Sequence, residues 1–197
     1  MLLQNKQFRI CLLASGRGTN VQNFINYFRH NPNIDVSLVI SDNPNAYVLT
    51  RAKKENIPAI VIEREEWSKK KHVLSILKQH KIDFIALAGF LSLVPTYLIE
   101  AYPERIVNIH PALLPNYGGK GMYGQKVHKA VLEAGEKTSG ITIHFVNEEY
   151  DRGKIIFQEA CDIWETDTPE SLSEKIQMLE YKNYPSIVEK LILNIKK

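Results

Sequence analysis

The sequence has little cysteine. Two cysteines, Cys11 and Cys161, occur in 197 residues, and they form no CxxC pair. Isolated cysteines of this kind are typical of reduced thiols in the cytosol rather than of a disulfide framework. Four of the six histidines fall on expected helices without the spacing of metal ligands: His30, His72, His80 and His128. The sequence therefore predicts neither a disulfide nor a metal site.

Long apolar runs and a strong net charge are also missing. No stretch approaches the roughly 20 apolar residues that cross a bilayer, and residues 1–7 are too polar for a signal peptide. The formal net charge of +3 is too small to indicate a nucleic-acid surface. The lysines at 69–71 are interpreted as a solvated helix face. We therefore expect a cytoplasmic protein that acts on small molecules, binds neither membrane nor nucleic acid, and is a monomer or a homodimer.

What is present is an alternation of strand-like and helix-like segments through the first two-thirds of the chain. Such an alternation is typical of βαβ units around a parallel sheet, and the length favours one domain with a core that needs no disulfides. The periodicity predicts strands at 8–14, 36–41, 59–62, 84–88 and 106–109, and helices at 20–30, 47–55, 67–80 and 95–101.

The last third of the pattern is different. A helix is expected at 125–134, followed by strands at 140–146 and 154–161 that can pair antiparallel. Thr168 and Pro169 are typical of the start of a long helix, which Pro185 is expected to kink or divide. The sequence thus predicts an α/β, single-domain Rossmann-like fold over residues 1–197, with a mostly parallel twisted sheet flanked by helices, a C-terminal antiparallel strand pair and a long C-terminal helix.

The first turn between a strand and a helix, residues 15–20 (SGRGTN), contains two glycines. Exposed backbone N–H groups at a helix N-terminus favour an anion, so we expect this turn to bind a phosphate ester. Val21 stands where a dinucleotide site needs a third glycine, which argues against a dinucleotide even though Asp42 ends the second strand. A tight turn without a ligand is the alternative. A second glycine cluster, residues 118–121, lacks the preceding strand and the Ser or Thr of a Walker loop.

Two polar residues interrupt the apolar strand at 106–109. Asn108 and His110 are two positions apart, so their side chains project to one face, and the prolines that follow end the strand. A carboxamide donor beside an imidazole suits an acyl transfer, in which one group stabilises a developing oxyanion and the other moves a proton.

A carboxylate and a third histidine lie further along the chain. Asp151 opens a turn after the loop 147–150, and near His110 it would raise the pKa of the imidazole so that the ring donates a proton. By composition alone, Asp151 is a turn residue. His144, on an expected half-buried strand, is interpreted as a structural histidine.

Several of these segments, in one order, resemble the phosphoribosylglycinamide formyltransferase family. The resemblance runs from about residue 9 to about residue 185. Its pieces are 15–20 (SGRGTN), 87–90 (LAGF), 108–115 (NIHPALLP), 140–146 (GITIHFV), Asp151 with Gly153, and 177–180 (QMLE).

This resemblance implies transfer of a formyl group from 10-formyltetrahydrofolate, a co-substrate, to the amine of glycinamide ribonucleotide in purine biosynthesis. By resemblance, Asn108 binds the formyl oxygen, His110 donates a proton and Asp151 holds the imidazolium. The ribonucleotide-binding half is about 1–100 and the catalytic and folate-binding half is about 101–197. The implied ribonucleotide-binding residues are Gly18, Thr19, Asn20, Gln177 and Glu180. The implied folate-binding residues are Leu91, Ser92, Leu93, Val94, Asn108, Asn147, Glu148, Glu149, Tyr150 and Asp151.

The sequence departs from the common family pattern near these residues. Ser92 stands where an arginine is frequent, and residues 116–124 are unusually rich in glycine. The basic residue that helps bind folate in relatives corresponds to Arg64, Lys69 or Lys70, and the sequence does not decide among them. Arg152 and Lys154 flank Gly153, and their charge would lower the pKa of Asp151 further. The alternatives are a formyltetrahydrofolate hydrolase, a formyltransferase acting on methionyl-tRNA or an amino-sugar nucleotide, and a non-catalytic nucleotide-binding module.

Overall fold

The computed structural model describes residues 7–195. Its centre is a seven-stranded sheet with the order β3-β2-β1-β4-β5-β6-β7. Strands β1 to β5 are parallel, β6 is antiparallel to β5, and β7 is antiparallel to β6. The strands are β1 (Phe8–Leu13), β2 (Ile34–Ser41), β3 (Ala59–Val61), β4 (Phe84–Leu87), β5 (Ile106–His110), β6 (Thr138–Phe145) and β7 (Ile155–Asp162). The predicted fold class and the predicted antiparallel pair are confirmed.

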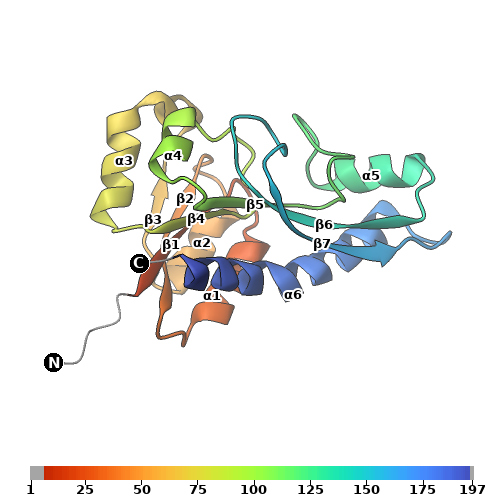
Figure 1. The fold of residues 1–197 in the computed structure, drawn as a ribbon, viewed down its shortest axis with the longest axis horizontal. Helices are drawn as coiled ribbons and strands as arrows, with labels where there is room; N and C mark the ends of the chain where they lie inside the picture. The colour runs from red at the N-terminus through yellow and green to blue at the C-terminus, as the bar shows by residue number, and fades with distance from the viewer. Residues whose placement is uncertain (1–6, 196–197) are drawn as a thin grey trace.

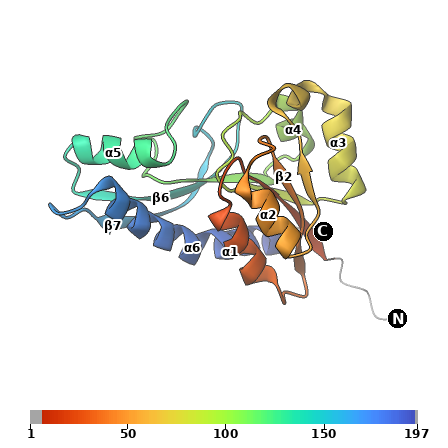
Figure 2. The ribbon, with the colours of Figure 1, turned by 180° about the vertical axis from the view of Figure 1, so that it is seen from behind.

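Helices cover both faces of the sheet (Figures 1 and 2). They are α1 (Thr19–Phe28), α2 (Tyr47–Lys54), the 3₁₀ helix η1 (Arg64–Ser68), α3 (Lys70–Gln79), α4 (Thr96–Ala101), α5 (Gln125–Glu133) and α6 (Pro169–Asn194). Apolar residues of α1, α2, α5 and α6 join one core cluster, and those of η1, α3 and α4 join the other. A parallel sheet buried on both faces needs apolar residues pointing both ways, which explains its continuous apolar strands.

The helix predicted at 67–80 is shorter than expected. Residues 64–68 form the 3₁₀ helix η1, and α3 begins only at Lys70. The break follows from Trp67, whose indole Nε1 donates to the carbonyl of Ile62 at 2.9 Å and turns the ring into the core. The long-range packing of one aromatic side chain thus overrides the helical periodicity.

The expectation that Pro185 divides the C-terminal helix is wrong. Helix α6 continues through Pro185 for 26 residues. Proline lacks the N–H that would bond the carbonyl four residues earlier, and that carbonyl, on Tyr181, instead accepts a hydrogen bond of 3.0 Å from Asn23 Nδ2 of helix α1. A neighbouring helix therefore supplies the donor that the proline removes.

Helix α6 is also anchored to the centre of the sheet. Tyr184 is fully buried, and its hydroxyl lies 2.8 Å from the carbonyl of Leu87, the last residue of β4, and 3.2 Å from that of Val107, within β5. This contact fixes the helix beside the carboxyl ends of the parallel strands, which is where α/β sheets bind ligands. Among residues 7–195, no helix has both the length and the apolar character needed to cross a membrane.

Candidate active site

A cavity of about 530 Å³ opens at the carboxyl ends of β1, β4 and β5. Its walls come from the turn after β1, the segment after β4, the end of β5, the loops 119–124 and 146–151, and one face of α6. Every predicted site residue lines this cavity except Glu148, which points elsewhere from an exposed position. The residues predicted from five distant segments therefore line one cavity.

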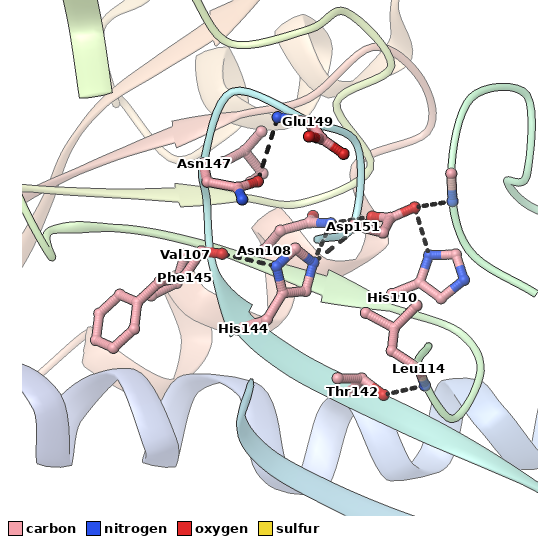
Figure 3. A network of polar contacts seen from close by, with 12 residues as sticks. Val107, Asn108, His110, Leu114, Thr142, His144, Phe145, Asn147, Glu149 and Asp151 are labelled. Carbon is pink, nitrogen blue, oxygen red and sulfur yellow. Dashed lines mark hydrogen bonds and ion pairs between the residues drawn. The ribbon is translucent and has the colours of Figure 1, made fainter. Parts of the chain in front are cut away.

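His110 lies at the end of β5 and is 3% exposed. Its Nδ1 is 3.4 Å from Asp151 Oδ2 (Figure 3). Its Nε2 is 2.8 Å from the carbonyl oxygen of Tyr117. Both neighbours are acceptors, so the protonated ring satisfies both contacts, while the neutral ring keeps a single N–H for one of them.

Asp151 is the centre of the polar network. Its Oδ2 also accepts a hydrogen bond of 2.9 Å from the backbone N–H of Gly119. Its Oδ1 accepts one of 3.3 Å from Asn108 Nδ2 and lies 3.6 Å from His144 Nε2. Four groups from three loops and strands thus hold one carboxylate that is 10% exposed.

His144 belongs to this network, although the sequence suggested a purely structural role. It is the direct cross-strand partner of Asn108 in the β5–β6 pair, which brings the two side chains together. His144 Nδ1 donates to the carbonyl of Phe145 at 2.8 Å, since a carbonyl can only accept, and His144 Nε2 lies 3.2 Å from Asn108 Nδ2. The ring therefore orients the Asn108 carboxamide.

The turn that follows β5 is held by Thr142, the cross-strand partner of His110. Its hydroxyl accepts from the N–H of Leu114 at 2.9 Å and donates to the carbonyl of Ala112 at 2.7 Å. Gln158 on β7 donates to the Leu114 carbonyl at 3.0 Å. These contacts fix the path of the chain that carries the Tyr117 carbonyl to His110.

The pKa of His110 beside Asp151 differs from the expectation. Burial lowers the pKa of His110 and outweighs the charge of Asp151 and the Tyr117 carbonyl, which both raise it. The predicted rise is therefore wrong, and the net direction is downward. Burial by itself raises the pKa of Asp151, but His144, His110 and the Gly119 N–H together bring it below its usual value. The lowering comes from these groups rather than from the predicted Arg152 and Lys154.

The glycine turn has the geometry of an anion site. Gly18 adopts φ 69° directly before α1, and no side chain caps the first N–H groups of that helix. A Cβ on Gly18 would lie 2.4 Å from Val48 Cγ2, so α2 packs closely against the turn. The Gly16 carbonyl accepts from the Val48 N–H at 3.1 Å and helps fix this arrangement. The free N–H groups and the helix dipole favour a phosphate.

Helix α6 lies along the other side of the same space. Glu180 Oε2 accepts a hydrogen bond of 2.8 Å from Asn20 Nδ2, and Gln177 Nε2 lies 3.5 Å from Thr19 Oγ1. Desolvation raises the pKa of Glu180 to about 7, although Asn20 opposes the rise. Residues that are about 160 positions apart in the sequence therefore meet at the start of α1.

Of the three candidate cations Arg64, Lys69 and Lys70, Arg64 lines the cavity. Its Nε is 3.5 Å from Ser92 Oγ, and Ser92 in turn donates to Asp42 Oδ2 at 2.6 Å. Asp42 therefore contacts the cavity wall through Ser92. The cation beside Ser92 is Arg64, the first residue of η1.

Several residues of the site were not found from the sequence. The Tyr117 carbonyl and the Gly119 N–H act through the backbone and leave no signal in residue type. His144 did have a signal, since its spacing from Thr142 mirrors that of Asn108 and His110 on the adjacent strand. Among the described residues, no group of three or more His, Cys, Asp or Glu is arranged to hold a metal ion.

Comparison with known proteins agrees with this geometry. The formyl transferase family model matches residues 8–188. Phosphoribosylglycinamide formyltransferase from Bacillus subtilis (strain 168) is 35% identical over 93% of this chain and 94% of its own length. The chain belongs to the phosphoribosylglycinamide formyltransferase family.

Two further relatives show how far the family likeness extends. The chloroplastic phosphoribosylglycinamide formyltransferase of Arabidopsis thaliana is 40% identical over 91% of this chain, and the chain spans 64% of that relative's length. The crystal structure of phosphoribosylglycinamide formyltransferase from Bacillus Halodurans is 38% identical, with a TM-score of 0.86, and the match covers 95% of this chain and 97% of that one. The family likeness therefore includes both the sequence and the three-dimensional arrangement.

Proposed function

We propose that this transferase moves the formyl group of 10-formyltetrahydrofolate to the amine of glycinamide ribonucleotide. The observation that carries the proposal is one cavity that combines an anion-binding turn at Gly18 with Asn108, His110 and Asp151. A phosphorylated acceptor needs the first feature, and acyl transfer through a tetrahedral intermediate needs the second. Relatives named for this reaction support the same acceptor.

His110 moves the proton in this scheme. Burial lowers its pKa, which favours the neutral ring before the reaction. The substrate amine attacks the formyl carbon, and His110 takes the proton that the new ammonium nitrogen loses. The imidazolium then returns this proton to the folate nitrogen as the bond between that nitrogen and the formyl carbon breaks. Atoms and charges balance, and the products are the formylated ribonucleotide and tetrahydrofolate.

Asp151 and Asn108 stabilise the charges that appear during these steps. The Asp151 carboxylate lies 3.4 Å from His110 Nδ1 and favours the imidazolium for the short time that it exists. The Asn108 amide donates to the formyl oxygen as that oxygen gains negative charge. Without substrate, Asn108 Nδ2 lies 3.3 Å from Asp151 Oδ1 and 3.2 Å from His144 Nε2. When the substrates bind, the formyl oxygen takes the place of Asp151 Oδ1 as the acceptor.

The two substrates occupy opposite ends of the cavity. The ribonucleotide lies between the α1 turn and α6, on Gly18, Thr19, Asn20, Gln177 and Glu180. The folate lies between Leu91, Ser92, Leu93 and Val94 on one side and the loop of Asn147, Glu149, Tyr150 and Asp151 on the other. Within one domain, each substrate takes residues from both the proposed ribonucleotide half, at about 1–100, and the proposed catalytic half, at about 101–197, because Gln177 and Glu180 serve the ribonucleotide and Leu91 to Val94 serve the folate.

Turnover of 10-formyltetrahydrofolate, measured with and without glycinamide ribonucleotide, tests the proposal. We expect release of tetrahydrofolate only when the ribonucleotide is present. The His110→Ala variant should lose turnover while it still binds the ribonucleotide. Release to water without an acceptor would identify a hydrolase, and binding of the ribonucleotide without any turnover would identify a non-catalytic binding module; either result would contradict the proposal.

A further inference from the structure

His128 is a second histidine of the cavity wall that the mechanism above does not use. It lies in the first half of α5, lines the cavity and is 3% exposed. Its Nδ1 is enclosed and has no hydrogen-bonding partner among the residues that the structure describes. Buried polar atoms in proteins are nearly always hydrogen-bonded, so an enclosed, unpaired ring nitrogen at a cavity wall points to a partner that a ligand supplies.

A second unpaired atom lies in the same cavity. Asn20 uses its Nδ2 for Glu180, and its Oδ1 is buried without a partner within residues 7–195. Asn20 is 8% exposed and, like His128, lines the cavity. Two unpaired atoms on two different helices, α1 and α5, indicate one polar ligand that reaches both walls.

The position of helix α5 indicates which of the two substrates lies near His128. Helix α5 packs against α6, and Ile176 of α6 lines the cavity beside Gln177 and Glu180. The residues proposed for the folate come instead from the segment after β4 and from the loop between β6 and β7. His128 therefore lies on the ribonucleotide side of the cavity.

We propose that His128 binds the ribonucleotide through a hydrogen bond from its imidazole to an uncharged polar group, a ribose hydroxyl or the glycinamide amide. This inference rests on the proposed function and adds a binding residue to it. Burial, followed by a smaller effect of His110, lowers the pKa of His128, which favours the neutral ring. A neutral ring is suited to a hydroxyl or an amide rather than to a phosphate, which the turn at Gly18 already serves.

Steady-state kinetics of the full chain with three variants tests this role. In His128→Leu, we expect the KM for glycinamide ribonucleotide to rise about tenfold or more, because a buried substrate group loses its partner. The KM for 10-formyltetrahydrofolate should stay within about twofold. His128→Asn, whose carboxamide places a polar atom close to the position of Nδ1, should recover part of the affinity. His72→Leu, at an exposed position on α3, is the matched control and should behave as wild type.

Other outcomes would overturn the inference. An unchanged KM for the ribonucleotide in His128→Leu, equal losses for both substrates, or no recovery in His128→Asn would each show that His128 only supports the fold. If His128→Leu does not fold, titration of the ribonucleotide into His128→Ala, which has no polar atom at this position, carries the test, and wild-type affinity of this variant would refute the role. Failure of the proposed function is distinguishable, because the wild-type protein itself would then neither bind nor formylate the ribonucleotide.

Discussion

Replacing Asp151 with asparagine removes one negative charge from the polar network and keeps its shape. The carboxylate contacts His110, Asn108, His144 and the Gly119 N–H. A hydrogen bond to a charged group contributes about 1.5–3 kcal/mol, and each 1.36 kcal/mol on the barrier is about tenfold in rate. Loss of one such contact therefore slows the reaction about 10- to 150-fold, and general acid–base catalysis as a whole contributes about 10²- to 10⁴-fold. We therefore expect kcat of Asp151→Asn to fall by at least about tenfold and at most about 10⁴-fold.

The pH profile gives this prediction a direction as well as a size. The negative charge of Asp151 raises the pKa of His110 against the effect of burial. Without that charge, the pKa of His110 falls further, so the acidic limb of kcat/KM, measured from pH 5 to 9, should move to lower pH. Asp162→Asn, at the exposed end of β7, is the control for removal of a carboxylate and should retain wild-type rates. A kcat for Asp151→Asn within threefold of wild type, or an acidic limb that moves to higher pH, would refute the reasoning.

Three further predictions concern the supports of the site. In Asn23→Ala, the Tyr181 carbonyl of α6 loses the donor that Asn23 supplies, and Pro185 has no N–H to offer in its place. We expect the free energy of unfolding, measured in urea, to fall by about 1–3 kcal/mol. An unchanged unfolding midpoint would show that the contact is dispensable. Gly18→Ala forces a Cβ against Val48 at a positive φ and should cost about 2–4 kcal/mol in the same assay, while Gly16→Ala, with open space around its Cβ, should cost far less. For Glu180, the pKa in the folded protein lies above the unfolded value, so the folded state binds more protons and wild-type stability falls as the pH rises from about 4.5 to about 7. Glu180→Gln removes this loss and should be more stable than wild type by about 1–3 kcal/mol at pH 8. One pKa unit corresponds to roughly 1.4 kcal/mol, and the expected gain lies below the full conversion because the side chain keeps some contact with solvent. An advantage of the variant that is equally large at pH 4 would contradict this sign.

The sequence predicted the parts of the fold that depend on local patterns. Apolar periodicity located the strands and most helices, since the residues that face a core repeat at fixed intervals within each segment. The division expected at Pro185 does not occur, because the donor that replaces the missing N–H comes from Asn23, more than 150 positions earlier. The predicted helix is shorter for a related reason, since the Trp67 ring packs against Phe90 and other core residues from distant segments.

The candidate site, like the fold, was predicted where local patterns decide and missed where distant segments pack together. The spacing of Asn108 and His110 indicated a shared face, and the family resemblance supplied Asp151. The role of His144 required knowledge that β6 pairs with β5, which puts it opposite Asn108. The direction of the pKa of His110 required knowledge of its burial, because the nearby carboxylate alone predicts the opposite sign. Sequence patterns thus indicated which groups take part, and the packing determined how they act on one another.

The most direct test of the central claim is to follow a carbon-13 label from the formyl group of 10-formyltetrahydrofolate in the presence of glycinamide ribonucleotide. The account predicts that the label appears in the formylated ribonucleotide, with one tetrahydrofolate released for each labelled product. Label recovered as formate, or label that stays on the donor, would contradict it.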